Sequence, residues 1–252
     1  MKRFIAALRF LTVIPLPGRW GTSEDELTGA ALYFPVVGVL IGVAAAALSL
    51  GVFRILPPLA GSVVLVIALS GISGGLHLDG LADTADGLLG CRSRERALEI
   101  MRDSHIGAMG AAAIAAVLML KAASLSSLSA AVSLRTVFLM PVAGRCALVI
   151  MMWLLPYARE TGGLGSVFYR RRPVLAGIWA VVLLVVAGWY ACGVAGVVAA
   201  VASVLVVAVF AAYVYRRIQG ATGDTLGAAC EMAECAAALT MAGWHFCGRG
   251  IA

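Results

Sequence analysis

The sequence predicts an all-α integral membrane protein: a polytopic bundle of about seven transmembrane helices with an N-terminal interfacial helix. Of the 252 residues, 62% are hydrophobic and only 13% are charged, and the mean hydropathy of +0.99 is far above that of soluble globular proteins. The apolar runs recur from Phe34 nearly to the C-terminus, with no polar block large enough for an aqueous domain. Residues 1–252 are therefore expected to form a single membrane-embedded catalytic domain.

The N-terminal segment, residues 1–28, is expected to lie at the cytoplasmic membrane surface. It begins with the basic residues of a signal peptide, but Arg9 divides its apolar run and no small-residue cleavage site follows. A retained amphipathic helix in the interface is the better interpretation. Further on, the acidic run 24–26 follows a polar, turn-rich stretch and predicts a solvated helix start.

Seven apolar stretches follow, each close to the roughly 20 residues that cross about 30 Å of hydrocarbon. The second of them is the shortest. Glycine and alanine are abundant in these stretches, which favours close packing between helices. The predicted spans are 34–53, 58–75, 107–125, 132–155, 174–192, 193–213 and 226–246.

The distribution of basic residues orients the bundle. With the N-terminus in the cytoplasm, fourteen of the nineteen Lys and Arg residues fall inside, as the positive-inside rule requires. The net charge of +6 is thus explained by topology, without a nucleic-acid partner. The inside residues are Lys2, Arg3, Arg9, Arg19, Arg92, Arg94, Arg96, Arg102, Arg159, Arg170, Arg171, Arg172, Arg216 and Arg217; Arg54, Lys121, Arg135 and Arg249 fall outside or at the outer boundary, and Arg145 within the fourth span.

An acidic motif lies at the end of the second span, in Gly74–Gly87. One histidine and three carboxylates stand within ten residues of each other: His77, Asp79, Asp83 and Asp86. On a helix the three aspartates, at i, i+4 and i+7, would share one face, and His77 would lie on another. The glycines of the motif could, however, interrupt such a helix. Like charges this close need a cation, and an oxygen-rich, sulfur-poor cluster favours Mg²⁺ or Mn²⁺ over zinc. His77 is a ligand, a proton carrier or a structural residue.

Residues 76–106 are expected to form a cytoplasmic acidic and basic catalytic loop. Arg102 and Asp103 stand directly before the glycine-rich start of the third span at Gly107. A guanidinium beside flexible backbone N–H groups suits phosphate, and a neighbouring carboxylate suits a metal or a proton. The other arginines of the loop are more simply explained by the positive-inside rule.

Two further polar groups come from distant spans. Gly223 and Asp224 precede the last span, in which Glu231 and Glu234 can share a helical face with Asp224. Carboxylates inside a membrane helix are costly and usually functional, although they can also neutralise buried arginines. Arg145, deep in the fourth span, is either a counter-ion for one of these glutamates or an anion hook facing a wet cavity. Carboxylates and arginines at one membrane face indicate metal-assisted phosphoryl or nucleotidyl transfer.

The motif Gly74–Gly87, GGLHLDGLADTADG, closely resembles the signature of the bacterial cobalamin synthase family, the adenosylcobinamide-GDP ribazoletransferases. Supporting matches lie at 9–17 (RFLTVIPLP), 100–110 (IMRDSHIGAMG), 144–145 (GR) and 223–228 (GDTLGA). The resemblance therefore covers essentially the whole chain. Its first motif is long and specific, whereas the Gly-Arg pair alone carries no information.

The resemblance implies an enzyme that performs the last step of cobalamin nucleotide-loop assembly in the bacterial cytoplasmic membrane. α-Ribazole, or its 5′-phosphate, would displace GMP from adenosylcobinamide-GDP to give adenosylcobalamin or its phosphate, with Mg²⁺ as cofactor. Either acceptor, the preferred lower-ligand base and a homo-oligomeric state stay open. The expected partners are these two substrates and the lipid bilayer.

Under this resemblance, each polar group of the chain takes a role in phosphoryl transfer. The motif aspartates Asp79, Asp83 and Asp86 would hold Mg²⁺ on the diphosphate. The remaining roles are phosphate neutralisation by Arg102 and Arg145, orientation or deprotonation of the attacking hydroxyl by Asp103 or His77, and substrate binding by Gly107, Gly223, Asp224, Glu231 and Glu234, with Asp224 also able to complete the metal site.

Two alternatives compete with this reading. CDP-alcohol phosphotransferases of lipid synthesis also place aspartates at a membrane face, but their acidic motif continues Asp-Gly-x-x-Ala-Arg, whereas here Asp79 leads through Gly-Leu-Ala to Asp83. A cation transporter would use Glu231, Glu234 and Arg145 as an ion path. Against it, the strongest acidic motif lies at a membrane edge and no paired half-repeats are visible.

Overall fold

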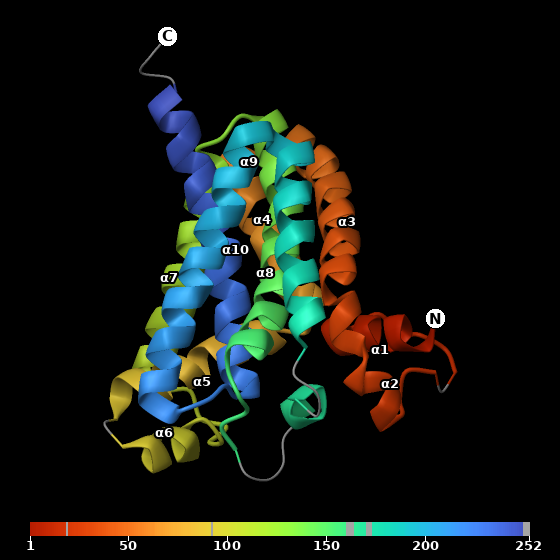
Figure 1. The fold of residues 1–252 in the computed structure, drawn as a ribbon. Coiled ribbons are helices and arrows are strands. Elements are labelled where there is room, and N and C mark those ends of the chain that lie inside the picture. The colour runs from red at the N-terminus through yellow and green to blue at the C-terminus, as the bar shows by residue number, and fades with distance from the viewer. Residues whose placement is uncertain (19, 92, 160–163, 170–172, 249–252) are drawn as a thin grey trace.

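The computed structural model describes the chain except residues 19, 92, 160–163, 170–172 and 249–252. The described part contains helices and no strands, and it forms an upright bundle with short helices gathered at one end (Figure 1). The all-α membrane bundle predicted from the sequence is thereby confirmed. Six of the arginines used to orient the bundle lie outside the described residues, namely Arg19, Arg92, Arg170, Arg171, Arg172 and Arg249.

The helices follow the apolar pattern of the sequence closely. They are α1 (Lys2–Leu11), α2 (Glu24–Thr28), the 3₁₀ turn η1 (Ala30–Tyr33), α3 (Phe34–Ile55), α4 (Pro58–Ile72), α5 (Leu76–Gly90), α6 (Arg94–Ile100), α7 (Ala108–Ser126), α8 (Ala130–Leu154), the 3₁₀ turn η2 (Leu164–Tyr169), α9 (Val174–Ile218) and α10 (Gly223–Gly248).

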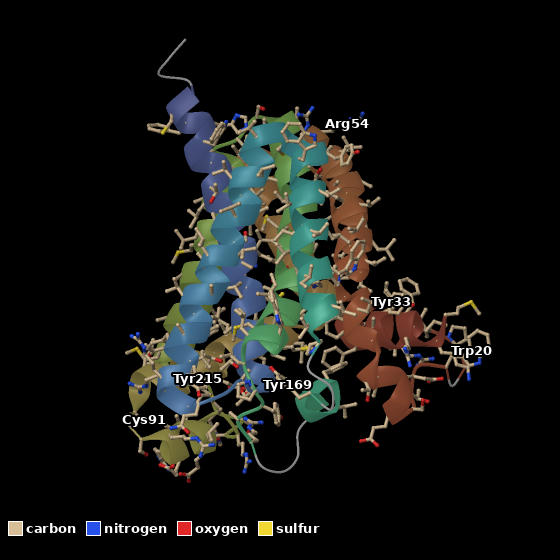
Figure 2. All side chains as sticks on the ribbon, in the orientation of Figure 1. Trp20, Tyr33, Arg54, Cys91, Tyr169 and Tyr215 are labelled. Carbon is tan, nitrogen blue, oxygen red and sulfur yellow. The ribbon has the colours of Figure 1, made fainter. Side chains whose placement is uncertain are left out.

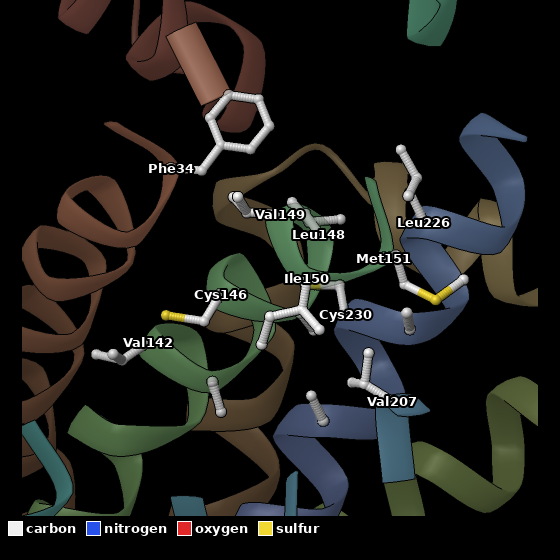
Figure 3. Close-up of a cluster of buried hydrophobic side chains, with 14 of the residues drawn as sticks. Phe34, Val142, Cys146, Leu148, Val149, Ile150, Met151, Val207, Leu226 and Cys230 are labelled. Carbon is white, nitrogen blue, oxygen red and sulfur yellow. The ribbon is translucent and has the colours of Figure 1, made fainter. Parts of the chain in front are cut away.

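Among the described residues, four segments are long and apolar enough to cross a membrane, namely 30–55, 108–126, 130–154 and 174–218, and the bent pair of α4 and α5 would make a fifth if it were one span. The most apolar part of α8 is 83% buried, against 28–44% in the other three, so α8 is the central helix and the others expose apolar side chains as lipid-facing helices do. Figure 3 shows α8 side chains packed with Phe34 of α3 and Leu226 of α10. The number of crossings stays a prediction.

The segment α9 is a hairpin of two helices that meet at Gly193. This residue has φ 57° and ψ −135°, a conformation that glycine adopts without steric cost. The two arms pack side by side (Figure 1), and a Cβ on Gly196 would lie 1.9 Å from the carbonyl oxygen of Gly188. The predicted boundary between the fifth and sixth spans at Gly193 is therefore confirmed.

The acidic motif is helical. Gly74 (φ 63°) and Gly75 (φ 77°) end α4 and turn the chain by 90° into α5, which lies across the end of the bundle rather than spanning it. Helix α5 runs unbroken over Leu76–Gly90, so the glycines within it do not interrupt the face that carries the three aspartates. The predicted loop 76–106 consists largely of the two helices α5 and α6.

The N-terminal segment lies at the same end of the bundle as α5. Helix α1 buries Ala6, Ala7 and Leu11 and exposes Lys2 and Arg3, as the amphipathic pattern predicts, whereas Arg9 is half-buried. Helix α2 begins with a capping box, in which Ser23 and Glu26 satisfy each other's backbone N–H groups. Figure 2 shows Arg54 at the opposite end from Cys91 and Tyr215, which agrees with the predicted alternation of sides.

Helices α5 and α10 cross with almost no space between their backbones. A Cβ on Gly80 would lie 2.8 Å from the carbonyl oxygen of Asp224, and one on Gly227 would lie 3.1 Å from that of His77. Small residues at such a crossing let two helices approach closely. The crossing brings the acidic motif beside the start of α10.

A single methyl group at this crossing is expected to destabilise the protein. Gly80→Ala should lower the free energy of unfolding by about 1–3 kcal/mol, because backbone rather than a flexible side chain must move. Gly71→Ala on α4 is the matched control, since a Cβ there has no neighbour within 4 Å. Thermal unfolding in detergent measures both, and an equal melting temperature for the two variants would contradict the close crossing.

Candidate active site

Two cavities meet beside the first turn of α5. The inner chamber, of about 200 Å³, lies between α5, α8, α10 and the aromatic residues near α1. The outer chamber, of about 700 Å³, lies between α1, the α4–α5 corner and the start of α7. Three residues border both chambers: Phe10, Leu76 and Asp79. The polar residues of the inner chamber are His77, Asp79, Tyr157, Arg159 and Asp224.

Four carboxylates gather where α5 meets α10. Burial, followed by the charges of Asp79, Asp224 and Asp86, raises the pKa of Asp83 to about 7. Both causes favour the neutral form of this carboxyl, and the charge of Arg159 opposes them only in part. In the described part of the chain, however, no three His, Cys, Asp or Glu side chains are already arranged to hold a metal ion. The predicted metal set of Asp79, Asp83 and Asp86 stays a prediction.

Both carboxylate oxygens of Asp86 accept hydrogen bonds from backbone N–H groups at the start of α7. Its Oδ2 accepts a hydrogen bond from the backbone N–H of Gly107 at 2.7 Å, and its Oδ1 accepts one from Gly110 at 2.9 Å. A Cβ on either glycine would come within 2.4 Å of this carboxylate. Asp86 therefore caps α7, and the glycines let the backbone approach it. Gly107 was predicted to bind substrate. In the structure, its backbone N–H donates to Asp86.

Arg159 is a site residue that the sequence reasoning missed. Its Nη2 donates to Oδ2 of Asp224 at 2.7 Å, and its buried Nε has no hydrogen-bond partner among the residues that the structure describes. Backbone hydrogen bonds from Ala158 to Ala221 and from Ala221 to Pro156 hold the two segments together. The sequence placed Arg159 only among the inside charges. Its position after the fourth span, at the same membrane side as Asp224, was the available signal.

The two glutamates of α10 belong to a buried ionic network. The Nζ of Lys121 donates to Glu231 at 2.6 Å and to Glu234 at 2.7 Å, and Nη1 of Arg145 donates to Glu234 at 2.5 Å. Each of the four side chains is at most 4% exposed. Of the two alternatives for Arg145, the structure shows the counter-ion. The outer-boundary position expected for Lys121 is wrong, because its ammonium lies inside the bundle between the two carboxylates.

This network contains two negative and two positive side chains, so its charges balance. Two atoms of Arg145, Nε and Nη2, are buried without a protein partner. Neither Glu231 nor Glu234 borders the inner or the outer chamber. The roles predicted for these glutamates in substrate binding, and for Arg145 in phosphate neutralisation, stay predictions.

His77 lies between the inner chamber and the interior of the bundle. It is 3% exposed, borders the inner chamber, and its Nε2 has no hydrogen-bond partner. Burial, together with the charge of Arg145, lowers the pKa of His77 to about 3. The ring is therefore neutral at physiological pH. His77 is buried, whereas Asp79 is exposed and Asp83 and Asp86 are half-buried.

The loop between α6 and α7 lies at the rim of the outer chamber. Oδ1 of Asp103 binds Nδ1 of His105 at 2.5 Å and accepts the His105 backbone N–H at 3.1 Å. This pairing lowers the pKa of Asp103 and raises that of His105. Neither Arg102 nor Asp103 borders a chamber, whereas Ile106 of the same loop borders the outer one. Their catalytic roles stay predictions.

Two arginines interpreted only as inside charges hold the α6 segment in place. Arg94 donates to the carbonyl oxygens of Ile218 at 3.1 Å and Ala158 at 2.9 Å. Arg217 donates to the carbonyl oxygen of Leu88 at 2.8 Å and to that of Cys91. These bonds tie the ends of α5 and α9 to the segment that carries Arg159.

Comparison with known proteins gives one consistent result. A family model described as cobalamin-5-phosphate synthase matches residues 3–242. The adenosylcobinamide-GDP ribazoletransferase of Roseiflexus sp. is 44% identical over 239 residues, which cover 93% of this chain and 87% of the relative. The enzyme of the same name from Clostridium novyi is 35% identical over 98% of this chain and 99% of its own. No solved structure matches the chain significantly.

Removing one positive charge from the buried network is expected to destabilise the protein. Lys121→Met leaves two buried carboxylates with a single positive partner, and should lower the free energy of unfolding by about 3–5 kcal/mol. The double variant Lys121→Met/Glu231→Gln keeps the charges balanced and should be more stable than Lys121→Met alone. Thermal unfolding in detergent compares them; a double variant less stable than the single one would contradict the proposed compensation.

The raised pKa of Asp83 predicts a pH-dependent stability. Because its pKa is about 7 in the folded state and about 4 in an unfolded chain, the folded state binds more protons between these values, and stability falls as pH rises through this range. Without divalent cations, the melting temperature of the wild type should fall more between about pH 5 and pH 8 than that of Asp83→Asn. If the melting temperatures of the two proteins change identically with pH, the raised pKa of Asp83 is contradicted.

Proposed function

The chain belongs to the cobalamin-5-phosphate synthase family, and we propose that it transfers adenosylcobinamide phosphate from adenosylcobinamide-GDP to α-ribazole or α-ribazole 5′-phosphate, with release of GMP. This is the last step of cobalamin nucleotide-loop assembly. The observation that carries the proposal is the carboxylate cluster with Arg159 at the junction of two chambers, since a diphosphate substrate and an alcohol must meet beside such charges.

The reaction needs a hydroxyl group brought to a phosphorus atom. A ribose hydroxyl of the acceptor that is free in both α-ribazole and its 5′-phosphate, and is therefore not the 5′ one, forms a bond through its oxygen to the phosphorus that carries cobinamide, and the bond from this phosphorus to the oxygen of the departing GMP breaks. GMP leaves with that electron pair, and the hydroxyl proton passes to a carboxylate of the cluster. His77 is suited to orient the hydroxyl, because its ring is neutral and its Nε2 is free.

Magnesium fits the donor chemistry of the cluster. The four carboxylates of the cluster offer oxygen atoms, and burial, followed by the charges of the neighbouring carboxylates, raises the pKa of Asp83. Asp79, Asp83 and Asp224 are the residues suited to hold the ion, while Asp86 is occupied at α7. When bound, Mg²⁺ neutralises the diphosphate and the developing charge on GMP.

Arg159 is the cation best placed for the phosphate oxygens. It borders the inner chamber and has a buried Nε with no partner, whereas Arg145 is held within the bundle by Glu234. Asp224 orients the guanidinium at 2.7 Å. A planar guanidinium binds two phosphate oxygens at once, which a lysine cannot reproduce. Arg102, at the rim, is proposed to meet the outgoing nucleotide.

The alternatives are less well supported. The relatives are named for transfer from a cobinamide-GDP compound, not from a CDP-alcohol. For a cation transporter, the glutamates of α10 would have to offer an open path. They are instead neutralised by Lys121 and Arg145 and buried.

The direct test incubates the purified protein with adenosylcobinamide-GDP, α-ribazole and Mg²⁺, and detects cobalamin and GMP by liquid chromatography and mass spectrometry. Arg159→Ala should lower kcat/KM by about 10²-fold, corresponding to about 2.7 kcal/mol of lost transition-state stabilisation, and Arg159→Lys should recover only part of it. Asp79→Asn should abolish turnover across a Mg²⁺ titration.

Glu99→Gln is the matched control, because this carboxylate lies on α6 at the same end of the bundle, is 68% exposed and pairs with Arg96. It should retain wild-type turnover. A wild-type protein that forms neither cobalamin nor GMP would overturn the proposed function. An Arg159→Ala variant with unchanged kcat/KM would overturn the role given to Arg159 alone.

A further inference from the structure

We propose that the two chambers separate the two substrates: the inner chamber holds the aromatic base of the acceptor nucleoside, and the outer chamber admits the cobinamide donor. This inference rests on the proposed function and assigns a binding site to each substrate. It is carried by the different walls of the chambers and by Asp79, the charged residue that borders both.

Aromatic rings form one wall of the inner chamber. The ring centroids of Phe10 and Phe168 are 4.9 Å apart, those of Phe34 and Phe168 are 5.3 Å apart, and those of Phe10 and Phe34 are 5.8 Å apart. All three rings border the chamber, and Tyr157 borders it as well. Such rings bind a flat heterocycle through stacked or edge-to-face contacts. The three phenylalanines come from α1, α3 and η2, so the wall exists only when these segments pack together.

The rest of the chamber has two chemically different sides. Leu148 and Met152 of α8 extend the apolar wall, and Met152 supplies an adaptable thioether surface. Asp79, Asp224 and Arg159 form the polar side. A ligand that fits must be flat and apolar at one end and hydroxylated at the other. A nucleoside with an apolar benzimidazole base meets this requirement.

Guanine fits the apolar wall poorly. Its edge carries several hydrogen-bond donors and acceptors, whereas Phe34, Phe168, Leu148 and Met152 offer none. Burying these groups without partners is unfavourable. The wall therefore discriminates between the base of the acceptor and the base of the donor, which is guanine.

The size and lining of the outer chamber suit the donor. Its volume of about 700 Å³ exceeds the 200 Å³ of the inner chamber, and adenosylcobinamide-GDP is much the larger substrate. Arg9 borders it and gives it a positive charge that favours a diphosphate, although Nη2 of Arg9 also donates to the carbonyl oxygens of Leu16 and Gly18. Asp79 borders both chambers. The acceptor hydroxyl and the donor phosphorus would meet there.

The test compares one variant from each chamber. Phe168→Leu keeps an apolar side chain but removes the ring, and should raise the KM for α-ribazole about tenfold, equivalent to about 1.4 kcal/mol, while leaving the KM for adenosylcobinamide-GDP within about twofold. Ile106→Ala, at an exposed residue that borders only the outer chamber, should do the reverse. Both KM values are measured with the other substrate saturating.

A second variant guards against misfolding of Phe168→Leu. Met152→Trp fills the inner chamber and should prevent binding of α-ribazole, measured by calorimetry without turnover, while adenosylcobinamide-GDP still binds. If either inner-chamber variant weakens the donor and not the acceptor, or weakens neither, the assignment is overturned. This outcome differs from failure of the proposed function, in which the wild type itself forms no cobalamin.

Discussion

The close crossing of α5 over α10 is the constraint on which the rest of the site depends. Because a Cβ on Gly80 would lie 2.8 Å from the backbone of Asp224, the two helices touch through their main chains. Side chains of larger volume would separate them and would disperse the carboxylates. The crossing instead places Asp79 and Asp83 next to Asp224, and burial together with repulsion between these carboxylates raises the pKa of Asp83. A site with this much uncompensated charge is suited to a cation and a polyphosphate.

A buried ionic network inside the bundle positions the helices next to this crossing. Lys121 of α7, Arg145 of α8 and Glu231 and Glu234 of α10 tie three helices together within the apolar interior. Ion pairs this deeply buried contribute little net stability, since desolvation offsets their attraction. Their geometry, however, is demanding: each charge needs its partner, so only one register of the three helices satisfies all four. We interpret the network as the element that specifies how α10 presents Asp224 to α5.

Parts of the site were predictable from the chain alone. The aspartates of α5 could be recognised because helical spacing determines which side chains share a face, and Asp224 because it precedes an apolar helix. Arg159 and Lys121 could not. Arg159 is 65 residues from its partner Asp224, and Lys121 is 113 residues from Glu234. No spacing rule relates residues that far apart, and each resembled an ordinary topological charge.

By itself the sequence determined the class of the protein, the helical segments, the acidic motif and its resemblance to one enzyme family, because hydropathy, helical periodicity and contiguous motifs are local properties of the chain. Tertiary structure alone decided the rest. It turned α5 by 90° across the end of the bundle and brought Phe10 and Phe168 to within 4.9 Å of each other. It also engaged Asp86 with the start of α7 rather than leaving it equivalent to the other motif aspartates. These outcomes depend on which helices pack together, and packing is set by the shape and charge of whole surfaces.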